Sequence, residues 1–172
     1  MWYVRKYDPL LWNGKCCLDA VSLSDLHTED NDISIWKVLS DKSNMDDIAL
    51  AMAMTRDKFK DFYVVYIAPS EVNRLGLKMN PKPGNTRYIA MQNEHDNIIV
   101  PTFWEIGFLT EHMHFLVNDP IKIRYFSEPE LQEFLYNAVK AGKLAKSTIM
   151  TDKNYKKYKQ PLQEMEKIYG AI

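Results

Sequence analysis

The stretch IALAMAM, residues 48–54, decides the fold, because seven consecutive apolar residues leave no polar side of a helix for water. Asn44 stands before this stretch as an N-cap, and Asp46 and Asp47 fall in the first turn, where the helix dipole favours negative charge. The pattern predicts a helix over 45–56 that is apolar around its circumference and packs against protein on most sides. We expect it to be the central helix of the core.

Strand patterns flank this helix on both sides. Residues 32–39, DISIWKVL, are rich in β-branched and aromatic side chains and alternate in part, which predicts a strand over 33–39. Residues 61–68, DFYVVYIA, form an apolar run that ends at Pro69, and such a run is typical of a strand over 62–68 with both faces covered. A strand, a buried helix and a second strand together predict a right-handed βαβ unit.

Four further segments have strand patterns. The aromatic run 2–7 predicts an opening strand, and 121–126 alternates between apolar and polar residues. Segments 87–91 and 97–100 surround a polar stretch and predict a short hairpin. The sheet therefore has strands from both halves of the chain.

Two capping boxes locate further helices. Thr102 and Ser127 are each followed three residues later by Glu, and apolar residues recur at helical spacing behind both. These patterns predict helices over 103–117 and 128–141, the second ending before Gly142.

Glycine and proline mark the segment between the second buried strand and the hairpin. Residues 70–75 predict a short helix ending at Gly76, and the run 80–86, with two prolines, predicts a loop. The fold class is therefore α/β or α+β, a single domain with a mixed sheet covered by helices. Residues 1–146 form this domain, and 147–172 form a lysine- and tyrosine-rich C-terminal extension with a short helix packed on the domain.

Charge is unevenly distributed along the 172 residues, although 22 basic and 23 acidic side chains give a net charge of −1. Residues 138–172 hold eight lysines and three acids, a net +5, which leaves 14 basic and 20 acidic side chains, a net −6, in 1–137. The acids concentrate between residues 19 and 47. This layout argues against a domain devoted wholly to nucleic acid, which would usually be strongly basic.

The acidic segment motivates a binding hypothesis. A dense acidic surface speeds association with a basic protein through complementary potential. We therefore predict a non-enzymatic binding protein, of the immunity or antitoxin kind, that inhibits a basic partner such as a nuclease toxin. Its contacts would come from Asp25, Glu29, Asp30 and Asp32, with Trp12 as an exposed aromatic anchor.

An enzyme is the alternative, although the chain carries no glycine-rich nucleotide fingerprint, GxSxG or HExxH motif. A small hydrolase or transferase would bring His27, His95 or His112 together with carboxylates such as Glu111 in one pocket. His112 and His114 point about 200° apart on a helix, so they cannot share a metal ion from it. We expect no metal and no cofactor.

Two cationic features of the sequence would suit anionic ligands, either a small anion or a nucleic acid. Lys82 and Arg87 flank a turn that can expose backbone amides, which suits an anion such as phosphate. The tail 153–159 interleaves lysines with tyrosines, a combination that contacts phosphates and stacks on bases. Nucleic-acid binding through this tail is the second alternative.

The cysteine pair Cys16-Cys17 and the N-terminus bear on location. A disulfide between adjacent residues is strained, so free thiols are expected. The opening residues lack the apolar run of a signal peptide, and the chain has no stretch of about 18 uninterrupted apolar residues. These features predict a cytoplasmic protein without a membrane span.

Overall fold

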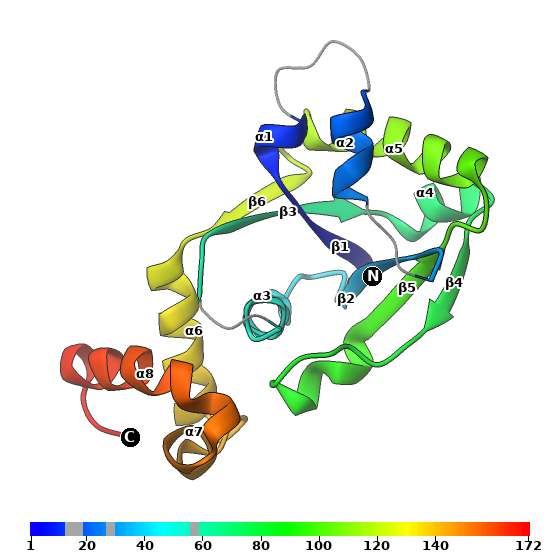
Figure 1. The fold of residues 1–172 in the computed structure, drawn as a ribbon. Coiled ribbons are helices and arrows are strands. Elements are labelled where there is room, and N and C mark those ends of the chain that lie inside the picture. The colour runs from blue at the N-terminus through cyan, green and yellow to red at the C-terminus, as the bar shows by residue number, and fades with distance from the viewer. Residues whose placement is uncertain (13–18, 27–29, 56–58) are drawn as a thin grey trace.

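The sheet contains six strands in the order β4-β5-β2-β1-β3-β6 (Figure 1). The computed structural model describes residues 1–12, 19–26, 30–55 and 59–172. In that part of the chain, all pairings between neighbouring strands are antiparallel. The strands are β1 (Trp2–Tyr7), β2 (Asp32–Val38), β3 (Phe62–Ile67), β4 (Lys78–Pro81), β5 (His95–Ile99) and β6 (Ile123–Phe126).

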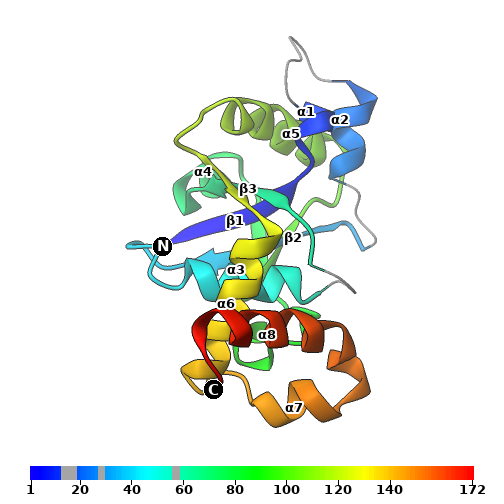
Figure 2. The same ribbon diagram turned by 90° about the vertical axis from the view of Figure 1, so that its left-hand side faces the viewer.

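Helices cover both faces of this sheet (Figure 2). One face carries α1 (Pro9–Trp12), α2 (Ala20–Asp25), α4 (Pro69–Arg74) and α5 (Phe103–Val117). On the other side α3 (Met45–Ala53) lies against the sheet, and α6 (Glu128–Lys140), α7 (Lys146–Thr151) and α8 (Lys156–Tyr169) pack beyond it in the same core. Two 3-10 turns complete the chain, η1 (Ile89–Glu94) and η2 (Lys153–Tyr155). The protein is thus an α+β domain with a separate apolar core on each side of the sheet.

Helix α3 is the central helix of one core, as its all-round apolar pattern predicts. Ile48, Ala49, Leu50 and Ala51 have no exposed surface although they point in different directions around the helix. The helix lies between the sheet and α6, which explains why residues 48–54 are buried on every side (Figure 2). The predicted buried strand next to it is confirmed as β3.

The predicted βαβ unit is present in a split form. Strands β2 and β3 each pair antiparallel with β1, so they run parallel to each other with β1 between them. The described sheet is therefore antiparallel rather than mixed. The local pattern of strand, helix and strand cannot reveal this, because the inserted strand comes from the start of the chain.

The prediction of a strand over 87–91 is wrong. Residues 89–94 form η1, and the hairpin partner of β5 is β4, which overlaps the predicted loop 80–86. Thr86 turns the chain there: its hydroxyl donates to the Ala51 carbonyl at 2.7 Å and accepts from the Tyr88 amide at 3.1 Å. Pro81 is tolerated because β4 is an edge strand.

The helix starts predicted at Thr102 and Ser127 are confirmed, but the side chains of Thr102 and of the predicted N-cap Asn44 make no cap hydrogen bond. Helix α6 begins at the Ser127 capping box, where the serine hydroxyl accepts from the Glu130 amide. Helix α5 follows Thr102, and α4 ends before Gly76, whose φ of 69° suits glycine. The C-terminal segment contributes apolar side chains to the core beside α3, among them Tyr155, Tyr158, Leu162 and Met165.

Candidate functional site

A polar row interrupts one otherwise apolar sheet face. Ser34 lies directly opposite Asn97 across β2 and β5, and Trp36 lies opposite His95. Residues that lie opposite on paired strands share a face, and so do alternate residues along one strand, which adds Asp32 to the row. Trp36 is buried in the core beside α3, whereas Ser34 is exposed. The sheet face thus changes from apolar to polar between these two residues.

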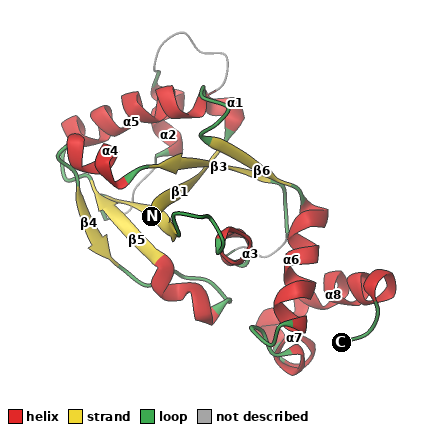
Figure 3. Ribbon diagram, turned by 180° about the vertical axis from the view of Figure 1, so that it is seen from behind, coloured by secondary structure: helices red, strands yellow, loops and turns green. Residues whose placement is uncertain are grey.

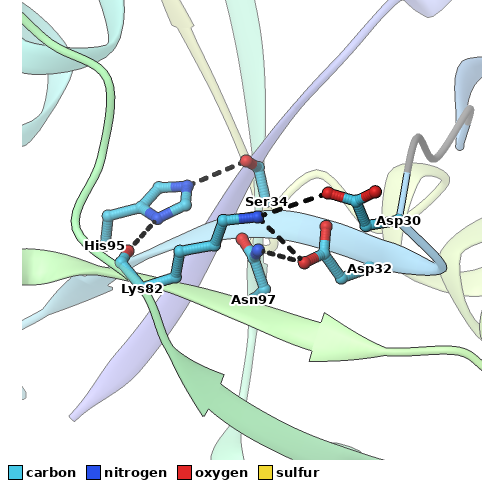
Figure 4. Close-up of polar contacts among 6 residues, drawn as sticks. All are labelled: Asp30, Asp32, Ser34, Lys82, His95 and Asn97. Carbon is cyan, nitrogen blue, oxygen red and sulfur yellow. Dashed lines mark hydrogen bonds and ion pairs between the residues drawn. The ribbon is translucent and has the colours of Figure 1, made fainter.

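Ser34 and His95 form a hydrogen-bonded pair in this row (Figure 4). The Ser34 Oγ lies 2.8 Å from His95 Nε2, and His95 Nδ1 lies 2.6 Å from the carbonyl oxygen of Lys82. Because that carbonyl only accepts, Nδ1 carries a proton, and in the neutral ring Nε2 is left to accept from the serine hydroxyl. Burial lowers the pKa of His95, which favours this neutral form.

The ring of His95 is held in place by its neighbours. The Trp36 ring meets it edge-on, with the ring centres 5.0 Å apart. The loop before η1 passes so close that a Cβ on Gly84 would lie 2.8 Å from Trp36 Cη2 and 2.9 Å from His95 Cβ. Only glycine fits this approach, so Gly84 is required for the packing around His95.

Carboxylates support the loop from its other side. Asp32 accepts from the Asn97 side-chain amide at 2.6 Å and lies 3.4 Å from Lys82 Nζ, while Asp30 lies 3.8 Å from the same ammonium (Figure 4). Lys82 therefore connects the two halves of the site: its backbone orients His95 and its side chain is held by acids. The charges of Asp32 and Asp96 act to raise the pKa of His95, but less strongly than burial lowers it.

A cavity of about 300 Å³ opens beside the pair where β1 and β2 diverge. These strands pair only from Trp2–Val38 to Val4–Trp36, and Arg5 occupies the gap beyond. Its Nη1 donates to the Ser34 carbonyl at 3.0 Å and its Nη2 to the Asp25 carbonyl at 2.9 Å.

The cavity is rich in hydrogen-bond donors. Lys6 and Asn85 line it together with Arg5, Ser34 and His95. Within the described residues, the buried Nε of Arg5 has no hydrogen-bond partner. Burial lowers the pKa of Arg5 to about 10, so the guanidinium still carries its charge at neutral pH.

A second cavity of about 540 Å³ shares Arg5 and Lys6 with the first. Its other walls are aromatic and acidic, with Tyr63 and Asp61 among the lining residues. The two cations therefore stand between two spaces, of which only the first contains the serine and the histidine.

The predicted partner-binding residues do not form one exposed surface. Trp12 is fully buried, and its Nε1 donates to Asp25 Oδ2 at 2.7 Å, so the prediction of an exposed aromatic anchor is wrong. Asp30 has 82% of its side chain exposed, whereas Asp32 has 19%. Glu29 lies outside the described residues. Asp32 and Asp25 serve internal contacts, which a sequence cannot distinguish from an acidic surface.

Other acids of the segment 19–47 meet cations from distant parts of the chain. Asp46 lies 3.6 Å from Arg124 and Asp47 lies 2.5 Å from Lys143. The acidic excess along the sequence is thus partly neutralised in space.

The two predicted histidines in the described part of the chain, His95 and His112, do not converge. His112 lies on α5, on the opposite side of the sheet from His95. Its Nε2 is 3.6 Å from Glu71, and its Nδ1 is 3.3 Å from Arg74. Glu111 is exposed on the outer side of the same helix, and His27 lies outside the described residues. The prediction that His95 and His112 share one site is therefore wrong. The side chain that hydrogen-bonds to His95 is Ser34.

The cationic candidates are engaged within the protein. Lys82 contacts Asp32 and Asp30, and the Arg87 guanidinium donates to the Tyr158 hydroxyl at 3.1 Å. Tyr155 is 8% exposed and Tyr158 has no exposed surface, so these two tyrosines are not available to stack on bases.

Sequence reasoning missed Ser34, Arg5 and Asn85. The alternation in 32–36 places Ser34 on one face, but the register against β5 that brings it to His95 is a long-range property. The place of Arg5 at the cavity could be predicted only from the point at which β1 and β2 stop pairing, which is also a long-range property.

Among the described residues, no group of three or more His, Cys, Asp or Glu side chains could hold a metal ion. None of the described helices combines the length and apolarity needed to cross a membrane. Comparison with protein-family models, curated proteins and solved structures finds no match to this chain.

Proposed function

We propose that the protein is a small hydrolase or acyl transferase in which Ser34 is the nucleophile and His95 the general base. One observation carries this proposal. The serine hydroxyl lies 2.8 Å from an imidazole nitrogen whose ring is oriented by a second hydrogen bond, at the wall of a cavity. A nucleophile next to a base that a third group orients is the arrangement by which serine is activated.

In the proposed reaction, His95 transfers protons between Ser34, the departing alcohol and the attacking water. His95 Nε2 takes the proton of the Ser34 hydroxyl as Oγ attacks the carbonyl carbon of an ester, and the protonated ring then gives it to the departing alcohol. Water or a second alcohol attacks the acylated serine, and the same nitrogen takes its proton. The proton finally returns to Ser34 as the ester bond breaks. The carbonyl of Lys82 keeps Nδ1–H in place throughout.

The surroundings supply the charges that such a reaction needs. Lys6 and Asn85 line the cavity and carry an ammonium and an amide, donors of the kind that stabilise a developing oxyanion, although the Lys6 ammonium lies over the Phe62 ring, 4.2 Å from its centre. Arg5 adds a guanidinium whose Nε has no hydrogen-bond partner among the residues that the structure describes. Two cations in a cavity of about 300 Å³ favour a small ester that carries a carboxylate.

The first experiment measures covalent labelling by a fluorophosphonate probe and hydrolysis of two esters, para-nitrophenyl acetate and mono-para-nitrophenyl succinate. We expect the probe to label Ser34 and the succinate ester to be the better substrate. Ser34→Ala abolishes labelling and hydrolysis, while Ser70→Ala, which removes an exposed serine from α4, is the matched control. Labelling that persists in Ser34→Ala would falsify the assignment.

The role of the cations has its own test. Lys6→Met should remove most of the preference for the succinate ester and leave the acetate ester nearly unaffected. If the preference stays the same, the cavity does not recognise the carboxylate through Lys6.

The protein-inhibitor hypothesis, nucleic-acid binding through the tail and the cytoplasmic location stay predictions. Asp30 is the predicted contact residue that is most open to a partner. Charge reversal at Asp30 that leaves capture of a basic partner and its salt dependence unchanged would argue against the inhibitor hypothesis.

A further inference from the structure

Helix α5 has apolar side chains on both sides. Its inner side packs in the core through residues such as Leu109 and Met113, which are 1% and 0% exposed. On its outer side Trp104, Phe108 and Phe115 are 73%, 51% and 65% exposed. At 3.6 residues per turn, these three aromatic side chains fall within an arc of about 40° and along about 16 Å of the helix axis. We call them the outer α5 face.

Gly107 lies on this helix next to the outer α5 face. Glycine inside a helix costs about 1 kcal/mol relative to alanine. A Cβ added at Gly107 would meet no atom within 4 Å, so no close packing inside the protein explains the glycine. The missing side chain does allow another helix to approach the backbone closely.

We infer that the outer α5 face binds the same face of a second copy of this chain, with the two α5 helices antiparallel. Figure 3 shows α5 at the outside of the molecule, across the sheet from α6, α7 and α8. A two-fold axis between the helices would place Trp104 of one copy against Phe115 of the other and bring the two Gly107 backbones near the centre. This inference is independent of the proposed catalytic pair, which lies on the opposite side of the sheet.

Charges at one edge of the outer α5 face favour a second copy as the occupant, whereas exposed Glu111, beside Phe108 and Phe115, would lie near Glu111 of the other copy at the opposite edge. Glu105 is the third residue of α5 and His112 the tenth, and because about two helical turns separate them, both lie on the same edge of the outer α5 face. Arg74 of α4 is exposed and lies 3.3 Å from His112. In an antiparallel pair the Glu105 of each copy therefore faces the Arg74 of the other. Two such contacts, one at each end, would fix the antiparallel direction.

The exposed area is of the right order for a dimer. Each aromatic side chain offers roughly 150–250 Å² when fully exposed, so the three aromatic residues of the outer α5 face present about 280–470 Å² of apolar surface. A standard interface buries about 800 Å² per partner. The aromatic side chains alone cover about half of that area, so the interface also needs polar residues around them, such as Arg74 of α4.

The first test is the molar mass of the purified chain across a range of concentrations, by light scattering and sedimentation. We expect a dimer that dissociates on dilution, and Phe108→Glu should raise its Kd at least tenfold. Ile168→Glu is the matched control, because Ile168 is 66% exposed but lies on α8. A wild-type chain that is monomeric throughout, or a dimer unaffected by Phe108→Glu, would overturn the inference.

The second test uses the predicted charge contact. Arg74→Glu and Glu105→Arg should each weaken the homodimer by placing like charges together. Mixing the two variants should restore a heterodimer, since each changed charge then meets an opposite one. Mixing without recovery, while both variants keep the wild-type circular dichroism, rules out the antiparallel arrangement.

A lipid surface is the other occupant that aromatic side chains would suit. Sedimentation with phosphatidylcholine and phosphatidylglycerol vesicles distinguishes it. We expect no binding to vesicles at concentrations where the chain is a dimer. Vesicle binding that Phe108→Glu abolishes would instead assign the outer α5 face to membranes and overturn the dimer.

Discussion

His95 and His112 offer a direct comparison, because both rings are largely buried and burial lowers the pKa of each. They differ in what surrounds the two ring nitrogens. His95 has a carbonyl acceptor on one side and a serine hydroxyl on the other. His112 has the guanidinium of Arg74 near one nitrogen and the carboxylate of Glu71 at 3.6 Å from the other.

The difference shows that a lowered pKa does not by itself identify a catalytic histidine. A general base needs a neutral ring, a fixed tautomer and a hydroxyl within hydrogen-bond distance. His95 meets all three conditions and stands at a cavity. His112 is surrounded by charges, including Lys122, that balance one another on the surface of α5 and α4.

The strongest test of this difference between His95 and His112 is to remove each imidazole in turn. His95→Ala should lower kcat/KM for the succinate ester by roughly 100- to 10,000-fold, the usual contribution of a general base. His112→Ala should change it less than twofold. Equal losses in both variants would show that the two rings matter through stability rather than chemistry, and thermal unfolding of each variant separates these explanations.

The next effect concerns the packing that holds His95. Gly84→Ala forces a Cβ to within 3 Å of Trp36 and His95, so we expect the free energy of unfolding to fall by about 1–3 kcal/mol. Gly107→Ala on α5 meets no neighbour and should stabilise the monomer by about 1 kcal/mol. Urea unfolding at concentrations below the dimer Kd measures both. Stabilisation by Gly84→Ala would contradict the close approach at Gly84, and destabilisation by Gly107→Ala would contradict the open space beside Gly107.

The elements were predictable where one local pattern determined them. The apolar circumference of residues 48–54 identified the core helix, and the boxes at Thr102 and Ser127 located two more helices. The order of strands was not predictable, since β1 pairs with two strands that follow it by different intervals. The 87–91 prediction failed because the side-chain bonds of Thr86, and not a strand pattern, set the chain path.

The candidate site was predictable only in part. His95 was singled out because carboxylates adjoin it in sequence, yet in the structure burial outweighs their effect on its pKa. The serine that gives His95 a role is 61 residues away in sequence. The prediction that Trp12 is an exposed anchor was wrong because its ring nitrogen donates to an internal carboxylate, that of Asp25. With this hydrogen bond made, the whole ring is buried.

A smaller effect is expected at the carboxylate that supports the loop. Asp32→Asn removes the charge that holds the Lys82 ammonium but keeps a side chain of the same shape. Because the Lys82 backbone orients His95, kcat should fall by up to about tenfold, the lower range for a supporting group, with KM little changed. Asp30→Asn is the control, since Asp30 is more exposed and lies farther from Lys82. Equal effects of both changes would mean that Asp32 acts only as surface charge.

The smallest effect is the dependence of stability on pH. A histidine whose pKa is lower in the folded state than its ordinary value near 6.5 binds a proton more readily when the chain is unfolded. Its contribution to stability is therefore complete above that ordinary value and is lost as the pH falls through the lower pKa of the folded state. Both His95 and His112 act in this direction.

The free energy of unfolding of the wild-type chain should thus decrease from pH 7.5 to pH 5. His95→Gln and His112→Gln should each flatten the decrease, and the double variant should be flattest. The esterase rate should fall over the same acid range, because protonated His95 cannot accept the serine proton. The rate should fall with acid equally in His112→Gln and in the wild type, although His112→Gln flattens the decrease in stability, and this result would separate the two rings by function. A stability slope unchanged in His95→Gln would show that its proton is not linked to folding.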